Sequence, residues 1–93
     1  MNEKKLKIAR NKIDKLDNNI FNLIKKRTLV VKHMLALKEH KNQIIDRKRI
    51  SEILKKIRKK SIKNKVDPKI ATKIWKTMIW SYVDYQKRNF KKK

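Results

Sequence analysis

The sequence predicts an all-α fold with three helices per chain, one long, one short and one of medium length, in an intertwined homodimer. The chain has 93 residues, no glycine and one proline, so it lacks the residues that most tight turns and hairpins need. Apolar residues recur at helical spacing along three separate segments. A chain this short buries only a modest fraction of its surface alone, which is the first indication of a partner chain.

The first helix is expected from about residue 4 to residue 40. Its apolar stripe consists of Leu6, Ala9, Ile13, Leu16, Ile20, Leu23, Val30, Met34 and Leu37. A helix of about 36 residues is about 54 Å long, because each residue adds about 1.5 Å. Two shorter helices of the same chain do not cover a stripe of that length. The remainder of the stripe is therefore expected to pack against a second copy of the chain.

A short second helix is expected after the polar segment 41–45. Asp46 is a suitable N-cap for it, because a carboxylate can accept the backbone N–H groups at the start of a helix. The apolar residues of this helix are Ile50, Ile53, Leu54 and Ile57. Residues 60–66 form another polar stretch, so the helix is expected to end before it.

The third helix is expected to begin at Asp67 and Pro68, which supply a cap and a first-turn proline, and to end near residue 89. Its stripe consists of Ala71, Ile74, Trp75, Met78, Ile79, Tyr82 and Gln86. No repeat or linker divides the chain. One helical domain is therefore expected over residues 1–93.

The formal net charge of +22 narrows the function classes less than its size suggests. Of the 30 basic residues 24 are lysines, spread from Lys4 to Lys93. Charge of this kind is usually a solvated face, and we attribute much of it to composition. Nucleic acid is therefore not the expected partner. The alternative from another class, a basic helical nucleic-acid-binding module, predicts cations gathered on an exposed face and binding that weakens steeply with salt.

Several chemistries lack the residues that they need. Without cysteine there is no disulfide framework and no thiolate nucleophile. His33 and His40 have no companions at metal-ligand spacing, so no metal is expected. No nucleophilic triad, glycine-rich phosphate loop or paired-carboxylate site is present. No apolar run of membrane-spanning length occurs, so the protein is expected to be soluble and cytoplasmic, without a membrane partner.

Polar side chains stand where the stripes require apolar ones. Arg27 continues the stripe of the first helix and points inward. It either extends its charged end to water, pairs with a buried acid such as Asp14 or Asp17, or binds an anionic ligand. Lys38 returns to the same face about 16 Å further on. Arg10 lies about 25 Å before Arg27, so it reaches the same ligand only from a second chain. Gln86 interrupts the third stripe, either as an interior glutamine bonded to backbone or as a ligand-binding group.

These polar positions resemble those of the all-helical (AroQ-type) chorismate mutase superfamily over nearly the whole chain. The run that carries the resemblance is Arg10-x3-Asp14-x2-Asp17-x9-Arg27-x10-Lys38, followed by Asp46-x2-Arg49 and ending in Gln86. The resemblance implies a small dicarboxylate substrate of the chorismate type. It implies that Arg27, Lys38 and Arg49 bind the substrate carboxylates and ether oxygen together with the partner's Arg10. It also implies that Gln86 reaches the ether oxygen.

Two positions depart from the mutase pattern and are similar instead to the isochorismate pyruvate lyases of salicylate synthesis. Arg49 is followed by Ile50, where typical mutases have a glutamate that holds the substrate hydroxyl. Tyr82 stands four residues before Gln86, where mutases tend to carry serine. Asp46, in contrast, is more mutase-like. The resemblance therefore favours an isochorismate pyruvate lyase, an enzyme that often retains some mutase activity, and leaves chorismate mutase as the alternative.

Both reactions rearrange bonds within one bound molecule through a cyclic transition state, so the resemblance implies no cofactor and no covalent nucleophile. The catalytic residues it implies are Lys38, Gln86 and Arg27, and the further substrate-binding residues are Arg10, Asp46, Arg49, Ile50 and Tyr82. The arginines would clamp the carboxylates and hold the reactive conformer. Lys38 and Gln86 would stabilise the negative charge that grows on the ether oxygen. Ile50 and Tyr82 would shape the ring pocket.

Overall fold

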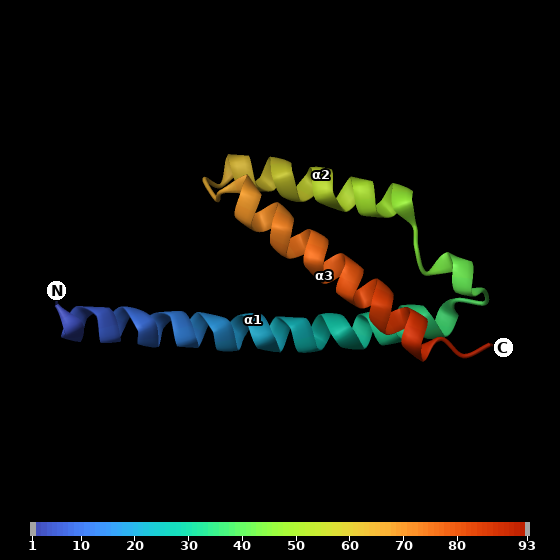
Figure 1. The fold of residues 1–93 in the computed structure, drawn as a ribbon, viewed down its shortest axis with the longest axis horizontal. Helices are drawn as coiled ribbons and strands as arrows, with labels where there is room; N and C mark the ends of the chain where they lie inside the picture. Colours follow the sequence, from blue (N-terminus) through green and yellow to red (C-terminus); the bar gives the residue numbers. More distant parts are fainter. Residues whose placement is uncertain (1, 93) are drawn as a thin grey trace. The chain divides into compact units, whose positions relative to one another are not determined.

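The computed structural model describes residues 2–92, and the described chain is all-α. Three α-helices follow one another: α1 over Glu3–Leu37, α2 over Arg47–Lys63 and α3 over Pro68–Asn89 (Figure 1). A short 3-10 helix, η1, covers Lys41–Gln43 between α1 and α2. No strand occurs within residues 2–92. The predicted class, with a long, a short and a medium helix, is confirmed.

The described chain divides into two compact units, and the boundary falls inside α1. The first unit ends at His33, and the second begins at Met34 and contains the end of α1, η1, α2 and α3. Within residues 2–92, no helix is both long enough and apolar enough to cross a lipid bilayer.

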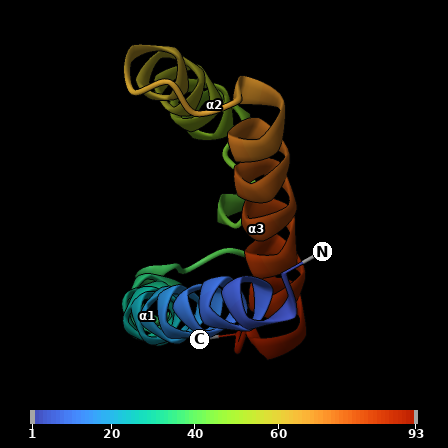
Figure 2. The same cartoon turned by 90° about the vertical axis from the view of Figure 1, so that its left-hand side faces the viewer.

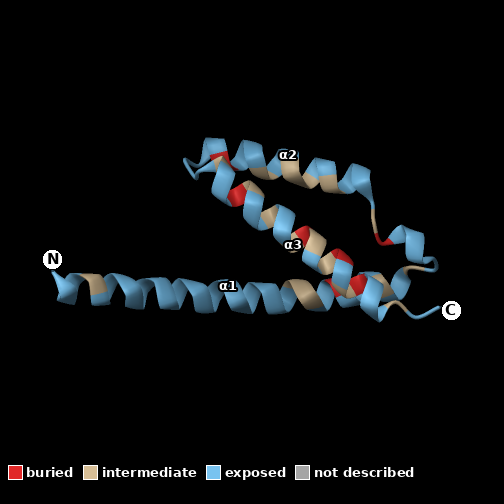
Figure 3. Cartoon of the chain, viewed as in Figure 1, coloured by how far each residue is buried: buried red, intermediate tan, exposed pale blue. Residues whose placement is uncertain are grey.

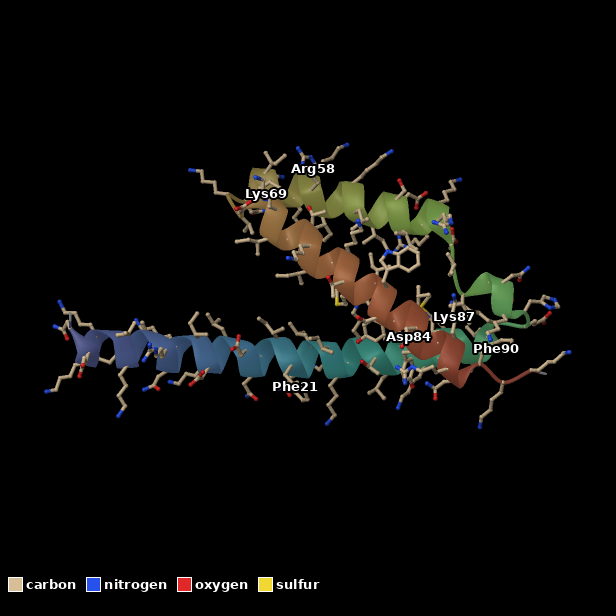
Figure 4. The ribbon with its side chains drawn as sticks, viewed as in Figure 1. Phe21, Arg58, Lys69, Asp84, Lys87 and Phe90 are labelled. Carbon is tan, nitrogen blue, oxygen red and sulfur yellow. The ribbon has the colours of Figure 1, made fainter. Side chains whose placement is uncertain are left out.

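The first unit is a stretch of α1 whose surface is largely exposed (Figure 3). Asn2 caps its start, because its side-chain Oδ1 accepts the backbone N–H of Lys5 at 3.1 Å. Large apolar side chains project from it into solvent, and Phe21, which is 66% exposed, is labelled in Figure 4. The others in this unit are Ile8, Ile13, Leu16, Ile20, Leu23, Ile24, Leu29 and Val30. Five of these residues, Ile13, Leu16, Ile20, Leu23 and Val30, belong to the apolar stripe that the sequence predicts, and they are exposed.

The first helix ends at Leu37, three residues before the predicted end, so Lys38 lies just beyond it. The chain then enters η1, which the sequence analysis did not predict. The side-chain Oε1 of Gln43 accepts the backbone N–H groups of both Glu39 and His40 at 2.8 Å. These two bonds replace helical hydrogen bonds that the ending helix no longer supplies, and they hold the segment that follows Lys38.

The second helix begins as predicted and ends later than predicted. Asp46 is its N-cap, and the side-chain Oδ1 accepts the N–H of Arg49 at 3.0 Å. The helix continues to Lys63, into the segment that was expected to be irregular, because lysine is a good helix former even where no apolar stripe marks the turn. Its end is a Schellman motif in which Val66 N–H donates to Ser61 O at 2.9 Å. Lys65, with φ 57°, takes the left-handed position that glycine usually fills.

The third helix begins at Pro68, and Asp67 caps it by accepting the N–H of Lys69 at 2.8 Å, as predicted. It pairs with α2 after a short turn, and Figures 1 and 2 show the two helices joined there and diverging with distance from it. The core of this unit lies on α3. Its buried apolar residues are Ala71, Ile79 and Val83 on α3, together with Ile44 between η1 and α2.

Candidate functional site

The second unit brings together two polar side chains that are 48 residues apart in the sequence. The Lys38 ammonium donates a hydrogen bond to the Gln86 side-chain oxygen, with Nζ and Oε1 2.6 Å apart. Lys38 follows the end of α1, and Gln86 lies in the last two turns of α3. Sequence reasoning expected each of the two to face inward; the structure shows that they meet.

Burial distinguishes Lys38 from the other lysines. Every other lysine within residues 2–92 is exposed, whereas Lys38 is partly buried. This burial lowers the pKa of Lys38 below its ordinary value, because desolvation penalises the ammonium, and the Asp46 carboxylate partly counteracts the shift. A cation that has lost part of its water interacts more strongly with any anion that reaches it.

Gln86 is 8% exposed, which is unusual for a polar side chain, and its orientation is fixed by two hydrogen bonds. Its Oε1 accepts from Lys38, and its Nε2 donates to the backbone oxygen of Tyr82 at 3.2 Å. An amide has two N–H donors and an ammonium has three, so each group keeps at least one donor beyond these bonds. The pair therefore has further N–H donors that an acceptor oxygen can use.

Asp46 and Arg49 stand together at the start of α2. The Asp46 carboxylate caps the helix through the backbone N–H of Arg49 and lies close enough to Lys38 to act on its pKa. The Arg49 side chain is exposed. Asp46 therefore has a structural role as N-cap in addition to any contact with a ligand.

A solvent-accessible hollow of about 1120 Å³ opens beside Lys38. It is lined by the segment around η1, by the start of α2 and by one residue of α3, namely Lys38, Lys41, Asn42, Gln43, Ile45, Asp46, Arg47 and Lys87. Four of these side chains are cationic and one is a carboxylate. The hollow therefore has a net positive charge and admits a small anion to the neighbourhood of Lys38.

Ile50 and Tyr82, the two predicted ring-pocket residues, are both partly buried, on α2 and α3 respectively. The Tyr82 backbone oxygen is a partner of Gln86. Neither residue lines the hollow.

The predicted arginines of α1 belong to the first unit, at a distance along the chain from the pair just described. Arg10 is exposed. Arg27 is partly buried, and every other arginine within residues 2–92 is exposed. Arg27 thus departs from the solvated pattern, although its neighbours in the predicted stripe, Leu23 and Val30, are 63% and 58% exposed.

Six residues that line the hollow were missed from the sequence, namely Lys41, Asn42, Gln43, Ile45, Arg47 and Lys87. Gln43, whose side chain holds the segment after Lys38, gives no signal beyond being a glutamine three residues after His40. Lys41, Arg47 and Lys87 line the hollow, and they are indistinguishable in sequence from the many other cations of the chain.

The family model of chorismate mutase type II matches residues 9–87 of the chain. That range includes every residue named above as a candidate for the site. No curated protein and no solved structure matches the chain significantly.

Proposed function

Because the chain belongs to the chorismate mutase type II family and is therefore an enzyme of the chorismate mutase type, we propose that its main reaction eliminates pyruvate from isochorismate to give salicylate. Rearrangement of chorismate to prephenate is the alternative main reaction, and it is expected as a side activity. The observation that carries the proposal is the hydrogen bond between Lys38 and Gln86. It holds the Gln86 amide beside the Lys38 ammonium, and Lys38 lines a positively charged hollow.

In the proposed reaction the ether bond between the ring and the enolpyruvyl group breaks while a hydrogen passes from the ring to the methylene carbon. Pyruvate leaves and the ring becomes aromatic. Negative charge grows on the ether oxygen as its bond to the ring lengthens. The remaining donors of Lys38 and Gln86 stabilise that charge, and fixed donors of this kind are worth most because they need no reorganisation during the reaction. The bond between Lys38 and Gln86 polarises the amide and strengthens its other N–H donor.

Ile50 is the residue on which we base the choice of isochorismate. It is partly buried on α2, and an apolar side chain offers no partner to the hydroxyl of chorismate. An unpaired buried hydroxyl costs about 1–3 kcal/mol, which shifts the preference between substrates by about tenfold or more. Isochorismate carries its hydroxyl at another ring carbon and avoids this cost. Asp46, which lies near Lys38, favours the mutase alternative, because it could receive that hydroxyl instead.

We also propose that two chains form the enzyme, with the active site shared between them. The exposed apolar residues of α1 support this, because burying apolar surface stabilises a protein by about 25 cal/mol for each Å² removed from water. Large apolar side chains that stay in water do not contribute this stabilisation. A second copy of the chain offers a stripe of the same length and chemistry. In such a dimer the partner's Arg10 joins Arg27 and Lys38 around the dicarboxylate.

The test is to offer the purified protein chorismate and isochorismate separately. We expect salicylate and pyruvate from isochorismate at the higher kcat/KM, and a slower formation of prephenate from chorismate. Faster conversion of chorismate would establish the mutase alternative. Failure to convert either substrate would refute the proposed enzyme function.

The variant Ile50→Glu tests the choice of substrate at one position. We expect it to raise the ratio of mutase to lyase kcat/KM by about tenfold or more, because glutamate can receive the chorismate hydroxyl. Ser51→Glu, at the neighbouring exposed position of α2, adds the same charge and serves as the control. An equal ratio in both variants would show that residue 50 does not set specificity.

A further inference from the structure

Three cations line the outer part of the hollow beside Lys38. Lys41 comes from η1, Arg47 from the start of α2 and Lys87 from the end of α3, and we call them the outer cations. All three are exposed, in contrast to the partly buried Lys38. Figure 4 labels Lys87 near the C-terminal end of α3. Segments far apart in the sequence thus place like charges around one opening.

The lining has one carboxylate against four cations, so its net charge stays positive. Asp46 uses a carboxylate oxygen to cap α2, and its field acts on Lys38. None of the outer cations forms an ion pair within residues 2–92. Like charges that face one opening without counter-ions repel one another, and an anion bound among them removes that repulsion. The hollow is therefore complementary to an anion with more than one charge.

We propose that the outer cations form a capture site, in which a small dicarboxylate is held before it moves to the Lys38 and Gln86 pair. This inference rests on the proposed function for the identity of the natural ligand. The capture site adds three residues, Lys41, Arg47 and Lys87, that have no part in the chemical step. Their effect is electrostatic attraction of the substrate, and it is largest where the ionic strength is lowest.

The size of the effect follows from Coulomb's law. At a separation of about 8 Å in water, one outer cation attracts a dianion enough to change its binding about fivefold without salt. At an ionic strength of about 0.15 M, where the Debye length is also about 8 Å, screening reduces this to about twofold. Removing all three cations should therefore raise KM about eightfold at this ionic strength and much more at low salt. The change in kcat should be small by comparison.

The experiment compares two triple variants with the same change in charge. The first, Lys41→Gln, Arg47→Gln and Lys87→Gln, removes the outer cations. The second, Arg58→Gln, Lys60→Gln and Lys69→Gln, removes three exposed cations elsewhere in the same unit, and Figure 4 labels two of them. Arg58 lies about 16 Å along α2 from Arg47, and Lys69 about 27 Å along α3 from Lys87. Because these distances are about two Debye lengths or more at 0.15 M salt, where one Debye length is about 8 Å, the control should leave KM within about twofold.

KM and kcat are measured for both triple variants over a range of salt concentrations. We expect the first variant to raise KM and to flatten the dependence of kcat/KM on salt, while the control keeps the slope of the unaltered protein. Equal effects of the two variants would overturn the capture site, because net charge rather than position would then explain them. A loss confined to kcat would overturn it as well.

A binding measurement separates this inference from the proposed function. Isophthalate, a stable dicarboxylate, and benzoate, its singly charged counterpart, are titrated into the unaltered protein, and backbone amide shifts of residues 41–47 are followed by nuclear magnetic resonance. We expect isophthalate to shift these signals at lower concentration than benzoate, and the first triple variant to abolish the difference. This result would hold even if neither chorismate nor isochorismate were converted. Equal affinity for the two ligands would refute a site for dianions.

Discussion

Replacement of Lys38 by methionine tests the site most directly, because methionine keeps the unbranched apolar stem and removes the ammonium. That ammonium donates to Gln86 Oε1 at 2.6 Å and is the partly buried cation of the second unit. We expect kcat to fall about 10²–10³-fold, the usual effect of losing one fixed donor at a developing oxyanion, which corresponds to about 2.7–4 kcal/mol. The loss should appear with either substrate.

The folded state should survive this substitution, because two effects on stability oppose each other. Gln86 is 8% exposed, and depriving its Oε1 of the Lys38 donor costs about 1–3 kcal/mol. The substitution also removes the free-energy cost of desolvating the ammonium, the same effect that lowers the Lys38 pKa. This gain in stability offsets part of the cost of the unpaired Gln86 oxygen. A net loss of at most about 3 kcal/mol is therefore expected.

Turnover is measured from the products, and folding is measured by circular dichroism and thermal unfolding. Lys48→Met is the matched control, because Lys48 is exposed on α2 and does not line the hollow. We expect this control to keep kcat within about twofold. A Lys38→Met protein that folds normally and keeps kcat within about threefold would show that the ammonium has no role at the ether oxygen. The catalytic role proposed for Lys38 would then be wrong.

Three further predictions follow from individual residues. Because burial lowers the Lys38 pKa, kcat/KM should fall as the pH rises through a value below 10.5, the ordinary value for lysine. The native state binds this proton more weakly than the unfolded chain, so stability relative to Lys38→Met should increase with pH between the lowered pKa and 10.5. Leu16→Glu, on the exposed stripe of α1, should weaken the dimer by about 1.5–3 kcal/mol for each copy in sedimentation experiments, whereas Lys15→Glu should not. Lys65→Gly should stabilise the protein by about 1 kcal/mol in thermal unfolding, because Lys65 has φ 57°, and an unchanged midpoint would show that this position is unstrained.

The starts of the second and third helices were predictable because their signals are local. Asp46 and Asp67 cap the helices that they were expected to cap, and Pro68 fits the first turn without losing a hydrogen bond. Helix ends were less predictable. The second helix continues to Lys63 through polar residues that an apolar pattern does not mark. The first helix ends at Leu37. Beyond it the backbone N–H groups of Glu39 and His40 donate to the Gln43 side chain and not to helical carbonyl oxygens.

The site was predictable in its members and less so in its geometry. The periodicity of the stripes shows that Gln86 faces inward, but periodicity has no information about which side chain lies opposite. The contact with Lys38 depends on how the segment after α1 packs against α3, which is a tertiary effect. The hollow was missed for the same reason, because Lys41, Arg47 and Lys87 become neighbours only when three elements fold together.

The large positive charge of the chain is a poor guide to its chemistry, and burial is a better one. Charges in water are screened within about 8 Å at physiological salt, so most of the 30 basic residues act weakly on any single ligand. Lys38 differs because it has lost part of its hydration, and its pKa is lowered as a result. A partly desolvated ammonium has lost favourable interactions with water, and a bound anion replaces them. The site is therefore better identified by the cation that departs from the solvated pattern than by the density of cations around it.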